Sequence, residues 1–127
     1  YAIPNLTTAD LDHAGSVLRQ YDAALDSGSQ IDNWSDYNFA FHHALYAPSG
    51  LPETLAMIGQ LNTKSGRYIR MQLLYTREIE KAELEHRQLL ELARLGDVDK
   101  ACQLLENHIK DAAEGIAAVL DKSLRSV

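Results

Sequence analysis

Apolar side chains recur every three or four residues along most of the chain, the spacing of one face of an α-helix. No stretch alternates strictly between apolar and polar residues, as a half-buried strand would. Glycine, proline, serine and asparagine divide the pattern into helix-length segments. The pattern therefore predicts an all-α protein, an antiparallel bundle of about five to six helices.

Local signals predict where the first two helices begin and end. Residues 7–10 (Thr-Thr-Ala-Asp) form a capping box that opens the first helix, and residues 27–29 (Ser-Gly-Ser) end it. Asp32 or Asn33 caps the second helix, which ends at residues 48–50 (Pro-Ser-Gly). The expected apolar stripe of the first helix is Leu11, Ala14, Leu18, Tyr21 and Leu25.

Three further helices are predicted, over about residues 52–74, 76–96 and 98–124. Pro52 suits the first turn of the third helix, and Asp97 caps the fifth. Four glutamates of the fourth segment are expected to form a solvated face: Glu78, Glu80, Glu83 and Glu85. The expected apolar positions of that helix are Ile79, Leu84, Leu89, Leu92 and Ala93.

Length and composition describe an ordinary globular domain. The chain has 127 residues, 46% hydrophobic and 24% charged, and we interpret residues 1–127 as one domain. A net charge of -6 argues against direct binding to a phosphate backbone. The single cysteine, Cys102, suits a reducing cytoplasm and is expected to be a small buried hydrophobe. No segment predicts a membrane span, and the start at Tyr1 suggests a fragment of a longer protein.

Two histidines lie at nearly equal distances from the turn signal Gly96-Asp97. His86 precedes this turn and His108 follows it, so two antiparallel helices would place both rings roughly 15 Å from the turn, at matching height. On another helix, Asn38 and His42 are one turn apart and point the same way. These four side chains are therefore candidates for a common site.

Three inward imidazoles on three helices suggest a divalent metal, because neutral imidazole is a good ligand for Zn, Ni, Co, Cu or Fe. The alternative is that each histidine is structural. His13 and His43 are expected to be surface or packing residues. Asn38 would be a neutral, weaker ligand, so open coordination positions would favour an anionic carboxylate.

Two segments resemble a known family. Residues 38–46 (NFAFHHALY) resemble its "(D/N)xxxFHxxL"-like signature once the spacing is read as Asn38 followed by Phe41-His42. Residues 85–90 (EHRQLL), followed by Gly96-Asp97, Ala101 and His108-Ile109, resemble its "EHxxLLxxxxxGDxxxA…HI" segment. Both are hallmarks of the FCD-type effector domain, the C-terminal half of FadR-subfamily regulators in the GntR superfamily of bacterial transcription regulators. The likeness runs from Leu6 to about Ile116.

The resemblance implies a sensor domain that dimerises and binds a small metabolite, while DNA binding belongs to an N-terminal winged helix-turn-helix domain that is absent here. It also implies a metal held by an Asp or Asn and three histidines, matching Asn38, His42, His86 and His108. Zinc is the first expectation, with nickel or another transition metal as alternatives. More members carry Asp where this chain has Asn38.

Family effectors are commonly small organic acids or sugar acids, and arginine suits the bidentate capture of a carboxylate. Arg70, in the sequence Tyr68-Ile69-Arg70, is the first candidate anchor and Arg67 the second. The expected partners are thus a small carboxylate metabolite and a second copy of the chain, in the cytoplasm, without a membrane.

Two other functions stay open. A metal-dependent enzyme would need a carboxylate near the metal, and only Glu85 is close in sequence, adjacent to His86 and so expected on another face. A structural dimerisation bundle would need no ligand at all. The sequence favours the sensor over both, so we do not expect an enzyme.

Overall fold

The computed structural model describes residues 1–26, 33–76 and 78–126. Over this part of the chain it contains five α-helices and no strand. The α-helices are α1 (Thr8–Asp26), α2 (Trp34–Tyr46), α3 (Pro52–Thr76), α4 (Ile79–Leu95) and α5 (Val98–Arg125). Two short 3-10 helices, η1 (Ile3–Asn5) and η3 (Ala47–Ser49), precede α1 and follow α2. The predicted all-α bundle is confirmed.

The predicted caps of α1 and α5 form as expected, whereas Asn33 at the N-cap of α2 makes no side-chain capping bond. The backbone N–H of Thr7 donates to the Asp10 carboxylate at 2.8 Å, and the Asp10 N–H donates to Thr7 Oγ1 at 3.1 Å. The Asp97 side chain accepts from the backbone N–H of Lys100 at 3.2 Å, which caps α5. Gly96 ends α4 in the left-handed region, at φ 70°. These bonds satisfy donors that a helix start leaves without partners.

The other boundaries differ from the prediction by a few residues. Helix α3 continues to Thr76, and α4 begins at Ile79 rather than near Thr76. Asn33 occupies the N-cap position of α2. Asp32 and the predicted stop at residues 27–29 lie outside the described residues.

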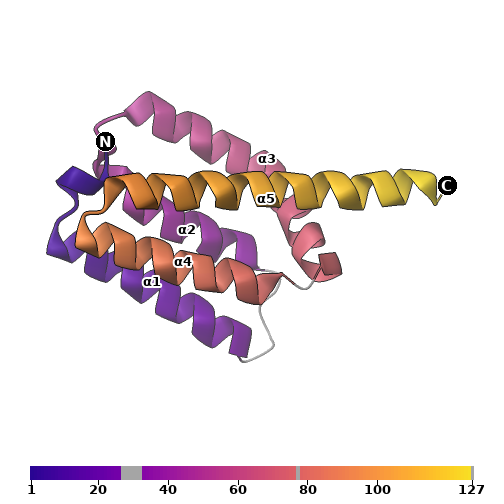
Figure 1. The fold of residues 1–127 in the computed structure, drawn as a ribbon, viewed down its shortest axis with the longest axis horizontal. Coiled ribbons are helices and arrows are strands. Elements are labelled where there is room, and N and C mark those ends of the chain that lie inside the picture. The colour runs from indigo at the N-terminus through magenta and orange to yellow at the C-terminus, as the bar shows by residue number, and fades with distance from the viewer. Residues whose placement is uncertain (27–32, 77, 127) are drawn as a thin grey trace.

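The helices pack around one apolar core. Helix α1 contacts α2 and α4, while α5 contacts α3 and α4, and α2 also contacts α3. Helix α5 is the longest, and its C-terminal part extends past the other helices (Figure 1). The largest buried apolar side chains of the core are Leu18, Tyr21, Trp34, Phe41, Leu45, Leu73 and Leu89.

Three predictions about burial were wrong. Leu84 is 52% exposed, whereas Glu83 beside it is buried. Cys102 is exposed, and its neighbour Ala101 faces the core instead. Consecutive helical residues point about 100° apart, so a shift of one position in the buried face exchanges such neighbours. Among the described helices, none combines the length and apolar character that crossing a membrane requires.

Candidate functional site

Three histidines from three helices meet in the core of the bundle. His42 comes from α2, His86 from α4 and His108 from α5, and one ligand nitrogen of each lies within 4.8 Å of the others. The His86 and His108 ring centroids are 5.0 Å apart, which confirms the convergence predicted from the Gly96-Asp97 turn. The His42 ring lies 4.9 Å from that of His86 and 5.4 Å from that of His108. We call these three residues the histidine cluster.

The histidine cluster is largely removed from solvent. His86 is 1% exposed and His42 is 7% exposed. The Phe41 ring lies 5.1 Å from the His86 ring and covers one side of it. Nε2 of His42 and Nε2 of His86 are 3.2 Å apart, so both nitrogens face the same point.

Burial keeps the imidazoles of His42 and His86 neutral. It lowers the pKa of His42 to about 3, and the charge of a nearby His108 would lower it further. Burial, followed by the proximity of His42 and His108, also lowers the pKa of His86 well below its usual value. A neutral imidazole has a nitrogen lone pair available, which is the form that coordinates a metal.

Two polar side chains lie within hydrogen-bond distance of the Nδ1 atoms of His42 and His108. The Tyr46 hydroxyl lies 3.4 Å from Nδ1 of His42, and a Glu85 carboxylate oxygen lies 2.7 Å from Nδ1 of His108. The prediction that Glu85 belongs to a solvated face, turned away from the histidines, was wrong. Helix α5 packs along α4 so that His108 contacts both Glu85 and its neighbour His86. Hydrogen bonds of this kind fix the tautomer and orientation of metal-binding histidines.

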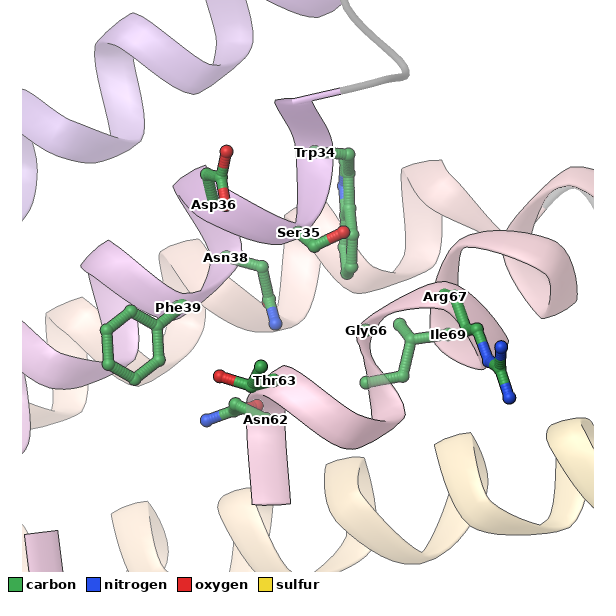
Figure 2. Close-up of a pocket in the computed structure, with 10 residues that line it drawn as sticks. All are labelled: Trp34, Ser35, Asp36, Asn38, Phe39, Asn62, Thr63, Gly66, Arg67 and Ile69. Atoms are coloured by element: carbon green, nitrogen blue, oxygen red, sulfur yellow. The ribbon is translucent and has the colours of Figure 1, made fainter. Parts of the chain in front are cut away.

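Asn38 lies one turn before His42 on α2 and lines a cavity together with His42 and His108. Its Oδ1 atom is buried and has no hydrogen-bond partner among the described residues. Its side chain points from α2 toward Asn62 and Thr63 of α3 (Figure 2). A buried amide oxygen without a partner has lost its water contacts, which favours a ligand beside it.

The chemistry of these donors suits a divalent transition metal, and the His42–His86 pair also meets the distance limit for one ion. Two nitrogens that bind one zinc ion at about 2.0–2.1 Å each can be at most about 4.2 Å apart. The 3.2 Å between the Nε2 atoms of His42 and His86 lies within that limit. Three imidazoles form a ligand set known from catalytic zinc sites, and the Oδ1 of Asn38, unpartnered among the described residues, offers a further donor.

Two neighbouring cavities open beside these residues. One, of about 370 Å³, lies among α2, α3 and α5, and is called the apolar cavity because most of its wall is aliphatic. The other, of about 290 Å³, lies between α2 and α3 and is called the polar cavity (Figure 2). Both are lined by Trp34, Asn38, Asn62 and Ile69.

The two predicted arginine anchors lie apart from the histidine cluster. Arg67 lines the polar cavity, is exposed, and donates to the Tyr68 hydroxyl at 2.7 Å. Arg70 is partly buried and lines neither of the two cavities. The effector-binding role of both arginines stays a prediction.

A comparison with protein families agrees with the sequence motifs on the domain family. The model of the FCD domain matches residues 1–111. This chain belongs to the FCD domain family. The match is consistent with the C-terminal effector-binding domain of GntR-family regulators, a regulatory rather than a catalytic module. No curated protein and no solved structure matches the chain.

The other two histidines of this FCD domain do not join the histidine cluster. His13 and His43 are both exposed, as predicted. The His43 ring packs beside Phe39, with centroids 5.6 Å apart. His43 thus shows that the position after His42 on α2 directs its side chain away from the histidine cluster.

Sequence reasoning missed two members of the site, Tyr46 and Glu85. A signal existed for Tyr46, which follows His42 by four residues and so lies on the same helix face. Nothing local indicated Glu85, because its partner His108 lies on another helix, 23 residues away.

Proposed function

We propose that this FCD domain senses a small carboxylate at a divalent metal ion. The residues that would hold the metal are His42, His86 and His108, with Asn38 as a weaker fourth ligand. The observation that carries the proposal is the cluster of three imidazoles, two of them buried and kept neutral, whose ligand nitrogens lie within 4.8 Å of one another. Zinc is the first expectation, with nickel or another transition metal as alternatives.

A bound metal would supply positive charge and open coordination positions for a carboxylate. This chain's own residues prepare the site. Tyr46 and Glu85 orient two of the imidazoles, and Phe41 excludes water from one side. Because Asn38 is neutral, the ligand set would leave the full metal charge to attract an anion. Arg67 lines the neighbouring polar cavity, so we assign recognition of the carboxylate to the metal before the arginines.

The regulatory step would follow from the position of the site between helices. A ligand beside the histidine cluster contacts α2, α3 and α5, so its binding favours one arrangement of these helices over another. In a full-length regulator of the FadR subfamily, a homodimer of such domains would pass this change to paired N-terminal winged helix-turn-helix domains on DNA. Coupling of this kind is typically about 1–3 kcal/mol.

Elemental analysis of the purified chain, before and after chelation, tests the metal site. We expect about one transition-metal ion per chain in the wild type, and loss of it in His108→Ala. His43→Ala is the matched control, because His43 is exposed and lies one residue from His42. Circular dichroism of each variant verifies that it is folded. Absence of stoichiometric metal from folded wild-type protein, also after incubation with zinc, would contradict the proposal.

The two arginines are tested in the same protein. We expect zinc-dependent carboxylate binding to persist in Arg70→Ala and Arg67→Ala and to disappear in His108→Ala. If Arg70→Ala abolishes binding while zinc is retained, the carboxylate is held by Arg70 as the sequence predicted. Conversion of the bound acid to a product would indicate an enzyme instead of a sensor.

A further inference from the structure

We propose that the effector of this domain is a carboxylate with a hydrocarbon body, such as an aliphatic or aromatic monocarboxylate, rather than a sugar acid. The inference rests on the proposed function, since the carboxylate end is placed at the histidine cluster. It comes from the wall of the apolar cavity, the larger of the two cavities beside that cluster.

Most of this wall is aliphatic. Helix α3 contributes Ile58, Leu61, Ile69 and Leu73, and helix α5 contributes Ile109 and Ile116. The described lining residues include no Asp, Glu, Lys or Arg. An anionic group of a ligand can therefore be neutralised only at the end of the cavity next to the histidine cluster. The rest of the ligand must be uncharged.

Two of the polar side chains on this wall are engaged elsewhere, whereas Oδ1 of Asn38 and Nε1 of Trp34 have no hydrogen-bond partner among the described residues. Gln72 donates to Thr76 Oγ1 and Glu78 Oε2, and Ser65 donates to the carbonyl oxygen of Leu61 at 2.7 Å. Asn38 and Asn62 lie where the apolar cavity borders the polar cavity. These two free polar atoms could serve only some of the hydroxyl groups of a sugar acid. The other hydroxyl groups would lose water without gaining hydrogen bonds, which is unfavourable.

The size of the cavity and its rim agree with a hydrocarbon occupant. About 370 Å³ is more than twice the roughly 150 Å³ of an engineered apolar cavity that binds benzene. Leu61 and Ile109 both line the cavity, yet they are 63% and 56% exposed. An apolar ligand that covers these exposed side chains removes their surface from water, which favours its binding.

The test compares two acids with the same six-carbon chain, hexanoate and gluconate. Binding to the zinc-loaded 127-residue chain is measured by calorimetry. We expect hexanoate to bind at least about tenfold tighter than gluconate. From propanoate to hexanoate, each added methylene should tighten binding roughly three- to fourfold. The same titrations after chelation report whether the metal takes part.

The outcomes separate this inference from the proposed function. Equal or tighter binding of gluconate overturns the inference, while zinc-dependent binding of either acid still supports a carboxylate sensor. Tighter binding of hexanoate that chelation does not change supports the hydrocarbon ligand and contradicts the role of the metal. If neither acid binds, the inference is overturned. In that case, if Leu61→Glu disrupted a dimer, the exposed apolar side chains at the cavity mouth would be assigned to contact with a second copy of the chain.

A cavity-filling variant locates the binding. Ala112 lines the apolar cavity one turn after His108, so Ala112→Leu should weaken hexanoate binding at least about tenfold. Ala118→Leu is the matched control, because Ala118 is exposed on the same helix and does not line the cavity. Equal hexanoate affinity in both variants would overturn the location.

Discussion

Glu85 and His108 join α4 to α5 through a contact of 2.7 Å between a carboxylate oxygen and Nδ1 of the imidazole. Both side chains are mostly buried, with 14% and 17% of their surfaces exposed. With Nδ1 engaged in this way, Nε2 of His108 is the nitrogen left for a metal. The contact thus determines which ring nitrogen of His108 is available to a metal.

Loss of this contact is expected to weaken metal binding without removing a ligand. Removal of an outer hydrogen-bond partner typically lowers metal affinity about 10- to 100-fold. We expect that loss in Glu85→Ala, measured by competition with a chelator of known affinity. Glu80→Ala is the control, since Glu80 is exposed on the same helix. Equal affinities in the two variants would show that Glu85 does not orient His108.

Asn38→Asp is expected to change metal and carboxylate binding in opposite directions. An aspartate would offset part of the metal charge, so zinc should bind at least about tenfold tighter and hexanoate at least about tenfold weaker, about 1.4 kcal/mol each. Zinc competition and calorimetry measure the two affinities. Asn107→Asp, at an exposed position of α5 next to His108, controls for the added charge. A change of both affinities in the same direction would remove Asn38 from the metal site.

Gly115 lets α5 approach the buried Gln72 side chain of α3. A Cβ atom added at Gly115 would lie 2.8 Å from Nε2 and 2.9 Å from Cγ of Gln72. Gln72 is 2% exposed and hydrogen-bonded, so it has little room to move. We expect Gly115→Ala to destabilise the fold by about 1–3 kcal/mol, although alanine favours helices. A thermal melt measures this as a lower Tm.

Gly59→Ala is the matched control for this clash. A Cβ atom at Gly59 would meet only Phe39, at 4.0 Å, which is an ordinary contact. This substitution is expected to stabilise α3 by about 0.5–1 kcal/mol, the gain in helix propensity. A Tm increase of similar size in Gly115→Ala would show that Gln72 moves aside freely.

The stability of the bundle is expected to depend on the protonation of Glu83. Burial, together with the hydrogen bond and charge of Asp22, raises the pKa of Glu83 from 4.5 to about 8 despite Arg87 nearby. Between these pH values the folded state binds more protons than the unfolded state, so this residue's contribution to stability falls as the pH rises from 4.5 to about 8. Glu83→Gln removes this dependence.

Thermal melts of Glu83→Gln and wild type at about pH 5 and pH 8 measure the effect. We expect similar Tm values at the lower pH and a Tm a few degrees higher for the variant at the higher pH. Glu80→Gln, at an exposed position of α4, is the control and should match the wild type at both. A lower Tm of Glu83→Gln at both pH values would mean that its ion pair with Arg87 outweighs its burial.

The sequence alone determined the helices and part of the site. Capping bonds such as those of Thr7 with Asp10 act within one turn, so their positions follow from neighbouring residues. The meeting of His86 and His108 also followed from the sequence, because a tight turn at Gly96 fixes the register of two antiparallel helices. His42 joined them in the prediction through its position one turn after Asn38 on an inward helix face, and the family motif indicated the same residue.

Tertiary packing decided which side chains face the core and what surrounds the histidines. Glu83 is buried and Leu84 is exposed because contacts with α1 and α5 determine which face of α4 is buried. Local helix propensity does not determine that choice. The contact of Glu85 with His108, and the aliphatic wall between α3 and α5, arise from residues distant in sequence. Burial and cavity shape depend on the relative positions of whole helices, and these exist only once the bundle is packed.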